Sequence, residues 1–373
     1  MAIAKKPPSE QLSAAKVGTL PKVQAGLSDA GIAVASPTLK DVARAAGVSV
    51  AAVSKALNNR EGVSDRSRTL VMKAAAELGY LDRNMKKGTA GLTCASLVTL
   101  GPMVSNDAFY QEIVDGITGE AAKIGLSVVI QILDETNGPH EDTISAKGAD
   151  AVILMGVDRP AYLDMVEASG LPAVIVNGMD RRMRFPSVSP DYHFGGWAAT
   201  KHLIDLGHKD IVHLTHVYRE SLRRRLEGFH DAMTEAGLAY DPDRHFLDLG
   251  SPDMIGLSAK PVIEAYLRSR ETLPSALFCM SDAVALAAIQ AMRSMGLTAP
   301  DDISVVGFDG LSIGAHSSPS LTTMHVDRRR LGALAIGALV DHAEDREAPV
   351  ERIGLGVTLL PRQSSGPVPD GRS

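Results

Sequence analysis

Residues 38–58 read TLKDVARAAGVSVAAVSKALN, and this pattern predicts two short helices joined by a tight turn. Thr38 followed by Asp41 is typical of a capping box that starts the first helix, and Gly47 is expected to end it. Ser49 is expected to cap the second helix. Small apolar residues recur at helical spacing in both helices, so each helix has one face to bury. The expected inward residues are Leu39, Val42, Ala43 and Ala46 in the first helix, and Val53, Ala56 and Leu57 in the second.

Residues 64–79 predict a third short helix, which Ser64 is expected to cap and Gly79 to end. Its expected inward residues are Leu70, Val71, Ala74 and Leu78. Three short helices joined by tight turns, with a glycine in the first turn, are typical of a helix-turn-helix unit. The alternative for the second helix is a small core helix with no ligand.

The charge is distributed unevenly along the chain. The 373 residues carry a formal net charge of −6, yet residues 37–90 contain ten Lys or Arg against five Asp or Glu. Residues 1–36 add a net charge of +2, which leaves −13 for the remainder of the chain. A small basic module on a large acidic body indicates that only the module meets a polyanion.

Length and composition indicate a soluble α/β protein of two or three domains. The residues are 45% hydrophobic, 22% charged and 4% aromatic, which is an ordinary composition. Cys94 and Cys279 form neither a metal-binding spacing nor a disulfide framework, which favours a reducing cytoplasm. We expect no membrane contact, because no run approaches eighteen apolar residues, and no secretory signal, because the first residues lack an apolar segment.

From residue 92 onward, short apolar runs alternate with helical patterns. The expected strands are 95–100, 128–133, 151–155, 173–176, 211–215, 275–280 and 303–308, and the expected helices include 108–124, 197–206 and 283–294. Continuous apolar strands interleaved with helices are typical of parallel sheets covered on both faces. About ten such units are too many for one sheet. We therefore expect two doubly wound α/β lobes, with ligands at the carboxyl ends of the strands.

Residues 38–58, together with VSD at 63–65 and AELGY at 76–80, closely resemble the DNA-binding headpiece of the LacI/GalR family of bacterial transcriptional regulators. Four landmarks similar to those of the family's effector domain follow in the family's order: GHKDI at 207–211, RLEGF at 225–229, ISVVGFD at 303–309 and PSLTT at 319–323. The resemblance covers roughly residues 37–365. It implies a periplasmic-binding-protein-like effector domain, a homodimer or tetramer, and operator DNA binding controlled by a small molecule.

The resemblance also implies how the chain is divided. It makes residues 37–80 the headpiece, 81–91 the hinge and 92–365 the effector-binding and dimerisation domain. Residues 1–36 are rich in Ala, Lys, Pro, Ser and Gly with weak periodicity, so we expect a disordered extension there, and residues 366–373 are expected to be a disordered tail. The chain of such a domain crosses between its lobes three times, here near Leu206, Met324 and Val350. Lobe 1 would then hold residues 92–206 and 325–350, and lobe 2 residues 207–324 and 351–365.

In this family the second helix lies in the major groove, and its N-terminal residues contact base edges. The positions that match the base-reading residues are Val50, Ala51 and Lys55, and those that match residues near phosphates are Ser49, Ser54 and Asn58. Lys55 is the only long donor among the base readers, and lysine can bind O6 and N7 of guanine. Val50 and Ala51 can offer only apolar contact, for example to a thymine methyl group.

Residues 80–91 depart most from the family pattern. Family members follow the Gly-Tyr pair with a hinge helix whose leucine wedges into the minor groove. Here Asp82 replaces the family's proline, Gly88 interrupts helix formation, and Thr89 falls in the register of the leucine. Met85 is the candidate wedge, and a hinge that does not insert is the alternative.

The same match gives the candidate effector-binding residues, which are Phe109, Tyr110, Asp191, Arg225, Ser281 and Asp309. An arginine and an aspartate that converge between aromatic side chains suit a polyhydroxylated ligand, since one donates and the other accepts. Ser281 stands where many sugar-responsive members carry asparagine, so a related polar metabolite is the alternative to a sugar. Each candidate also has a structural role as its alternative.

No feature of the sequence supports a metal, a cofactor or catalysis. His213 and His216 fall on opposite faces of an expected strand, so together with His208 they make a poor metal site. The sequence contains no GxSxG elbow and no Walker loop. The expected protein is a repressor of the bacterial cytoplasm and nucleoid. An activator or dual regulator is the nearest alternative, and a solute-binding protein is the rival of a different class.

Overall fold

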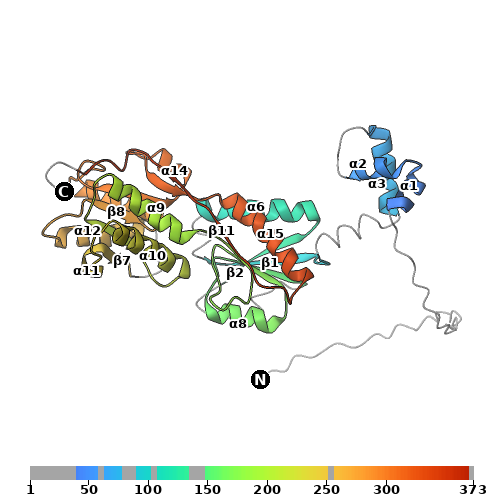
Figure 1. Ribbon diagram of the computed structural model, residues 1–373, viewed down its shortest axis with the longest axis horizontal. Coiled ribbons are helices and arrows are strands. Elements are labelled where there is room, and N and C mark those ends of the chain that lie inside the picture. Colours follow the sequence, from blue (N-terminus) through green and yellow to red (C-terminus); the bar gives the residue numbers. More distant parts are fainter. Residues whose placement is uncertain are drawn as a thin grey trace, which may run out of the picture. The chain divides into compact units, whose positions relative to one another are not determined.

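The computed structural model describes residues 39–57, 63–77, 90–101, 107–133, 148–250 and 256–368. The chain forms two compact units, Met1–Tyr80 and Leu81–Ser373. The short helices of the first unit are blue in Figure 1, and the second unit contains the two sheets. We call the units the headpiece and the effector unit.

The described part of the headpiece consists of the three predicted helices, α1 (Leu39–Ala46), α2 (Val50–Leu57) and α3 (Asp65–Glu77). Gly47 has a φ of +66° and ends α1, as expected of a glycine in this conformation. Val42, Val53 and Val71 are completely buried, one from each helix. The small apolar side chains within residues 38–58 therefore do form a core, into which each helix packs one face.

The predicted inward face of α3 was wrong at one position. Leu70 is exposed, and Ala75 is buried beside Val71 and Ala74 instead. At 100° per residue, positions 71, 74, 75 and 78 form one stripe, whereas position 70 lies at its border. The expected end of α3 and the expected cap at Thr38 lie outside the described residues.

The effector unit contains two lobes, each built on one six-stranded sheet. In lobe 1 the strand order is β11-β5-β4-β3-β1-β2, and all neighbours are parallel. The strands are β1 (Cys94–Leu100), β2 (Ser127–Leu133), β3 (Ala151–Met155), β4 (Ala173–Val176), β5 (Ser187–Pro190) and β11 (Arg352–Leu355). The helices of this lobe are α6 (Asp107–Ile124), α8 (Pro160–Ser169) and α15 (Arg328–Glu344).

In lobe 2 the strand order is β12-β10-β9-β8-β6-β7, in which only β12 is antiparallel to its neighbour. The strands are β6 (Ile211–Thr215), β7 (Phe246–Asp248), β8 (Ala276–Cys279), β9 (Ser304–Asp309), β10 (Thr322–His325) and β12 (Thr358–Leu360). The helices are α9 (Tyr192–Asp205), α10 (Glu220–Glu235), α11 (Pro242–His245), the 3-10 helix η2 (Gly256–Ala259), α12 (Lys260–Ser269), α13 (Asp282–Ser294) and α14 (Ser312–Ala315). No helix within the described ranges could span a membrane.

The predicted fold class is confirmed: two doubly wound lobes follow a helix-turn-helix unit in the chain. Two of the crossings between the lobes differ from the expected positions. Helix α9 packs on α10 and on the second sheet, so the first crossing lies near Asp191 and not near Leu206. Strand β11 pairs with β5, so the third crossing follows Leu355 instead of Val350. The second crossing lies between β10 and α15, next to the expected position at Met324.

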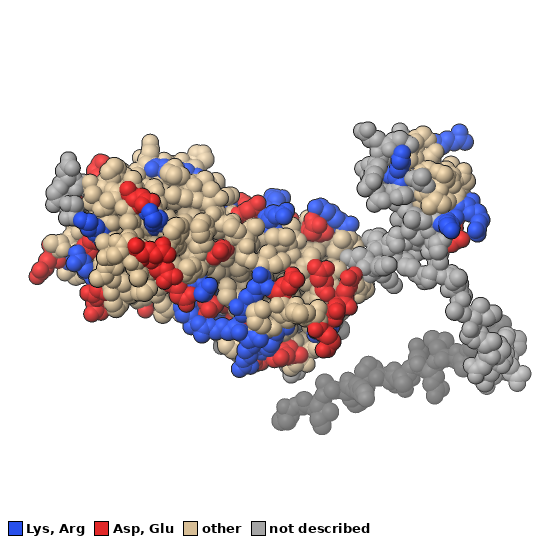
Figure 2. Space-filling view, viewed as in Figure 1, with Lys and Arg blue, Asp and Glu red and all other residues tan. Residues whose placement is uncertain are grey.

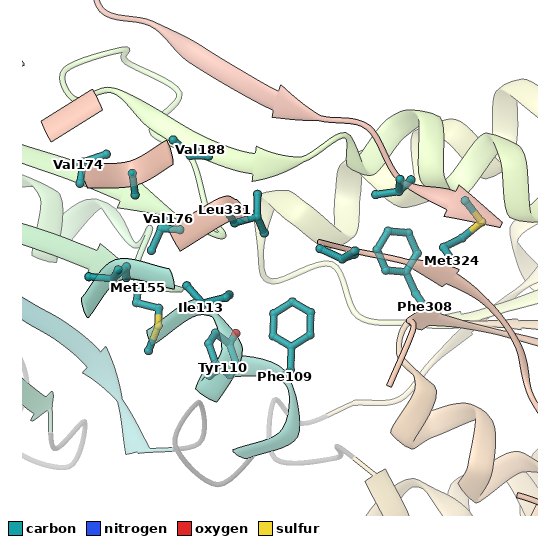
Figure 3. Close-up of a cluster of buried hydrophobic side chains, with 14 of the residues drawn as sticks. Phe109, Tyr110, Ile113, Met155, Val174, Val176, Val188, Phe308, Met324 and Leu331 are labelled. Atoms are coloured by element: carbon teal, nitrogen blue, oxygen red, sulfur yellow. The ribbon is translucent and has the colours of Figure 1, made fainter. Parts of the chain in front are cut away.

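One hydrophobic core cluster contains residues of both lobes. Phe109 and Tyr110 of α6 belong to it together with Val176 of β4, and so do Phe308 and Met324 of lobe 2. Figure 3 shows these side chains, with those of lobe 1 gathered around Tyr110 and with Phe308 and Met324 opposite them. The boundary between the lobes is therefore lined by aromatic and apolar side chains.

Helices α9 and α10 approach each other backbone to backbone. A Cβ atom on Gly196 would overlap the carbonyl oxygen of Arg225, and one on Gly228 would overlap that of His193. Only glycine allows such an approach at both positions. The approach fixes the part of α10 that carries Arg225 against the helix that follows the first crossing.

Candidate DNA-binding face and effector site

The outward face of α2 is the candidate DNA-binding face. Ser49 caps the helix, because its Oγ accepts a hydrogen bond of 3.1 Å from the backbone N–H of Ala52. Val50 and Lys55 are exposed, whereas Val53 and Ala56 are buried. The helix therefore packs on one side, and the described side chains on the other side include the apolar Val50 and the cation Lys55.

Helix α3 holds the C-terminal end of α2. The Arg68 Nη1 donates a hydrogen bond of 2.9 Å to the carbonyl oxygen of Ala56. Such a bond fixes the direction of α2 within the headpiece. Of the other candidate DNA contacts, Asn58, Met85 and the side chains of Ala51 and Ser54 lie outside the described residues.

At the boundary between the lobes, Asn177 joins groups from both. It follows β4 of lobe 1, and its Nδ2 donates to the Tyr110 hydroxyl at 3.2 Å. Its Oδ1 accepts from the Tyr192 hydroxyl at 2.8 Å, and its carbonyl oxygen accepts from Arg219 Nη2 at 2.8 Å. Its φ of +55° is a left-handed conformation that asparagine tolerates better than most residues. Burial raises the pKa of Tyr110, which keeps its hydroxyl protonated.

Arg219 precedes α10 in lobe 2 and faces an acid of lobe 1. Its Nε lies 3.7 Å from Asp158 Oδ1, which is within ion-pair range but too long for a hydrogen bond. Both Arg219 Nε and Asp158 Oδ2 are buried and have no hydrogen-bond partner among the described residues. The two side chains therefore leave one donor and one acceptor unsatisfied.

Arg225 is buried one turn and a half further along α10, with 6% of its surface exposed. Its Nη1 donates to the carbonyl oxygen of Met280 at 2.5 Å, and its Cζ lies 3.8 Å from the centre of the Phe308 ring and 5.2 Å from that of Tyr192. Burial lowers its pKa, and Asp309 partly opposes this effect. Its Nε has no hydrogen-bond partner within the described ranges. Arg225 is thus a desolvated cation that is held by aromatic rings and has a spare donor.

Asp309 ends β9 on the same side of lobe 2. Burial, followed by the neighbouring Asp282, raises the pKa of its carboxyl group well above the usual value. Its carbonyl oxygen accepts a hydrogen bond of 2.5 Å from Arg328 Nη1, while Arg328 Nη2 binds Glu112 at 3.0 Å. Arg328 starts α15 directly after the second crossing, so it links the end of β9 to lobe 1.

The remaining candidates occupy different surroundings. Phe109 packs edge-to-face on Tyr110 with ring centres 5.1 Å apart, at the lobe boundary. Asp191 is exposed and caps α9, since its Oδ1 accepts from Phe194 N–H at 3.0 Å. Ser281 caps α13 in the same way, at 3.2 Å from the Val284 nitrogen. The structure brings Tyr110, Arg225 and Asp309 to one region and gives Asp191 and Ser281 a role as helix caps.

Four residues of this region were missed by the sequence analysis. Asp158 follows β3, Asn177 follows β4, and Arg219 follows β6 by four residues. Tyr192 starts α9 directly after β5. The rule that ligand sites lie at the carboxyl ends of parallel strands could have found all of them.

The histidines that were set aside as a metal site have structural partners in lobe 2. His213 stacks on Phe278 with ring centres 4.3 Å apart, and its Nδ1 lies 2.9 Å from the Phe278 carbonyl oxygen. Burial lowers the pKa of His213 to about 3, so the ring is neutral. Within the described ranges, no group of three His, Cys, Asp or Glu could hold a metal ion.

Comparisons with known proteins identify both units of the chain. Residues 38–82 match the family of bacterial regulatory proteins, lacI family, and residues 200–365 match the periplasmic binding protein-like domain. The HTH-type transcriptional repressor PurR of Vibrio campbellii is 32% identical over 321 residues, which cover 83% of this chain and 93% of that protein. The chain belongs to the LacI family of bacterial regulatory proteins. A second PurR repressor, from Pasteurella multocida, is 32% identical over 334 residues, covering 88% and 98% of the two chains.

Solved structures of LacI-family proteins share the fold. A complex of the transcriptional regulator CelR with cellobiose has a TM-score of 0.66 at 25% identity, covering 88% of this chain and 99% of that one. The lac repressor dimer bound to operator and the anti-inducer ONPF has a TM-score of 0.64 at 26% identity, covering 89% and 100%. The predicted family is confirmed: the chain is a DNA-binding transcriptional repressor of the cytoplasm, and its relatives are regulators, not enzymes.

Proposed function

We propose that a small polar molecule, bound between the two lobes, switches the operator affinity of this LacI-family repressor. The observation that carries the proposal is a set of buried polar atoms from both lobes that have no hydrogen-bond partner among the described residues, namely Asp158 Oδ2 from lobe 1 and the Nε atoms of Arg219 and Arg225 from lobe 2. A buried polar group without a partner costs about 1–3 kcal/mol. A ligand that supplies these partners therefore favours the arrangement in which the lobes meet.

The chemistry of the site favours a sugar or a related polar metabolite. Arg219 and Arg225 offer donors, Asp158 offers an acceptor, and Phe308 and Tyr192 offer ring faces beside Arg225. A molecule with several hydroxyl groups carries both donors and acceptors and has an apolar ring face. The neighbour CelR is a cellobiose complex, which supports this class of ligand. Phe109, Tyr110, Asp191, Ser281 and Asp309 remain proposed contacts.

A thermal-shift screen of the purified repressor tests this proposal. The panel contains monosaccharides, disaccharides, polyols and neutral nucleobases, together with apolar compounds of similar size, each at several concentrations. A specific ligand stabilises the folded protein by mass action, by about 2.7 kcal/mol at one hundred times its Kd. Concentration-dependent stabilisation by a polar compound supports the effector site, and stabilisation only by apolar compounds would contradict it.

Binding is coupled to DNA through the lobes and a second subunit. The ligand would alter the angle between the lobes, and a homodimer would convey the change to the spacing of its two headpieces on a pseudo-palindromic operator. By thermodynamic linkage, operator DNA must then alter the ligand's affinity by the same factor. In this proposal residues 81–91 serve as hinge, Met85 is the minor-groove wedge, and the repressor is associated with the nucleoid.

Lys55 is the proposed polar reader of the operator, with Val50 and Ala51 as apolar contacts and Ser49, Ser54 and Asn58 near phosphates. Lys55→Ala is expected to cost about 1–3 kcal/mol on the preferred operator and to relax one base position. The measurement is fluorescence anisotropy on an operator selected from random DNA with the wild-type protein.

Lys73→Ala is the matched control for Lys55, because Lys73 is an exposed lysine of α3. It removes the same charge, so it should weaken binding to all sequences alike, if at all. If both variants lost affinity equally and both kept the wild-type base preference, Lys55 would have no role in reading bases.

The edge of the first sheet that β2 forms is the proposed subunit interface. Strand β2 is the terminal strand of lobe 1, and three of its large apolar residues are exposed: Val129 at 45%, Ile130 at 50% and Ile132 at 58%. An exposed apolar edge strand favours association with another chain. The dimeric state of the related lac repressor structure supports a second copy as the occupant.

Replacing Ile130 and Ile132 together with glutamate is expected to convert the dimer to a monomer, because burying two carboxylates at the interface costs several kcal/mol. The molar mass measured by light scattering after gel filtration gives the result. Met183→Glu, at another exposed apolar residue, should leave the mass unchanged. A dimer that survives the double substitution would place the interface elsewhere.

A further inference from the structure

Two consecutive residues at the start of α10 reach from lobe 2 across to lobe 1. Arg219 Nη2 donates to the carbonyl oxygen of Asn177 at 2.8 Å, and Glu220 Oε2 accepts a hydrogen bond of 2.8 Å from Arg181 Nε. Asn177 and Arg181 both lie between β4 and β5 of lobe 1. These two hydrogen bonds therefore join the same two short segments, residues 177–181 of lobe 1 and residues 219–220 of lobe 2.

The second bridge differs from the first in its surroundings. The Glu220 side chain is only 13% exposed, and its carboxylate also binds Arg223 of the same helix. The Arg181 side chain is 64% exposed, so the pair is partly solvated. Its neighbour Arg182 is equally exposed but pairs within lobe 1, with Asp164 at 3.7 Å. Figure 2 shows that Lys and Arg side chains gather near α8, along the lower edge of the effector unit.

We infer that the Arg181–Glu220 pair is a lock between the lobes, which sets how readily they separate without taking part in ligand binding. This inference rests on the proposed function in one respect, since it assumes that the lobe angle is the regulated quantity. Arg181 and Glu220 belong to different lobes, so their ion pair exists only while the lobes are together. The ion pair is absent when the lobes are apart, so it must shift the equilibrium between separated and closed lobes toward the closed state.

The lock acts on the helix that carries the proposed ligand contacts. Glu220 and Arg225 lie on α10, and Arg219 directly precedes it. Two arginines already donate to Glu220 Oε2 and neutralise the carboxylate's charge, so it attracts a ligand's donor less strongly. Arg181 and Glu220 are thus positioning residues: they hold the start of α10 against lobe 1, and the effector would add to a closure that they already favour.

The expected size follows from the exposure of Arg181. A solvated ion pair contributes about 0.2–1 kcal/mol, which corresponds to at most about a fivefold change in the ratio of closed to open lobes. The apparent affinity for a ligand is proportional to the fraction of molecules in the binding-competent state. Loss of the lock should therefore change the effector's apparent Kd by no more than about fivefold.

Hydrogen exchange followed by mass spectrometry on the full chain, without added ligand, tests the lock. In Arg181→Ala, peptides 107–113 and 216–222, which contain the facing residues of the two lobes, should exchange up to about fivefold faster. Peptide 284–292 of α13, whose buried residues pack within lobe 2 only, should be unchanged. Arg181→Lys should restore most of the protection, and raising the salt to 1 M should reduce the difference between wild type and Arg181→Ala.

Arg182→Ala is the matched control, since it removes an equally exposed arginine that pairs within one lobe. Equal exchange in Arg182→Ala and Arg181→Ala would overturn the lock. So would an effect of Arg181→Ala that simply adds to that of Glu220→Gln, because the two residues of one pair cannot act independently. The test uses no effector, so a negative result would rule out the lock without ruling out the proposed ligand site.

Discussion

Replacing Gly116 with alanine is expected to lower the free energy of unfolding of the effector unit by about 3 kcal/mol, the upper end for overpacking. Gly116 lies in α6, where an added Cβ would overlap the carbonyl oxygen of Arg329 in α15. The approach is mutual, because a Cβ on Gly332 of α15 would overlap the carbonyl oxygen of Ile113. The obstacles are backbone atoms, so no side chain can turn away and the two helices must separate.

Gly119→Ala provides the control within the same helix, three residues further on. A Cβ at Gly119 meets no atom within 4 Å, so the substitution should stabilise the unit by up to about 1 kcal/mol through helix propensity. Urea denaturation of both variants, followed by circular dichroism, measures the two effects. Effects of the same sign and size would show that the close approach of α6 and α15 contributes nothing to stability.

The same helix pair connects stability to the lobe boundary. Helix α6 carries Tyr110 and α15 begins with Arg328, and these side chains contact Asn177 and the end of β9. Separating the helices by even a fraction of an ångström would move both groups. Gly116→Ala should therefore also weaken the binding of any compound found in the thermal-shift screen, although Gly116 lies six residues along α6 from Tyr110.

The central strands of both sheets could be predicted from the sequence because each is a continuous apolar run. Strands such as β5 (Ser187–Pro190) and β11 (Arg352–Leu355) were not predicted, because they are short and contain polar or charged residues. Their pairing is decided by neighbours far away in the chain. For the same reason, the apolar pattern of α9 indicated a helix but could not show which sheet it covers.

The residues of the candidate site, too, could be predicted only in part from the sequence. Arg225 and Asp309 were found because they lie in sequence motifs, RLEGF and GFD, that mark the family. Asn177 and Arg219 lie in no such motif, and their importance comes from one contact across the lobe boundary. A contact of this kind depends on the angle between the lobes, which periodicity and composition do not describe. The side chains that meet at the lobe boundary do follow the ends of strands, but which of them meet there required the structure.

Arg225→Ala is expected to abolish the response to an effector while operator binding is retained. Arg225 supplies a buried charged donor beside Phe308 and Tyr192, so its removal leaves the ligand's acceptor unpaired. Truncating one partner of a buried charged hydrogen bond costs about 2–5 kcal/mol, and the ligand's Kd should therefore rise about 30-fold or more. The headpiece forms a separate compact unit, so the same headpiece residues should contact DNA in this variant.

Arg224→Ala is the matched control for this substitution, because Arg224 is the preceding residue of α10 and pairs with the exposed Glu227. Ligand affinity is measured by calorimetry with a compound from the thermal-shift screen, and DNA affinity by anisotropy on the selected operator. Arg225→Ala also removes a buried contact with the Met280 carbonyl oxygen, so each variant's unfolding is measured as well. Arg225→Lys separates the two effects, because it keeps the charge but loses the fork of donors that arginine offers. A folded Arg225→Ala protein that binds the compound as tightly as Arg224→Ala would remove Arg225 from the effector site.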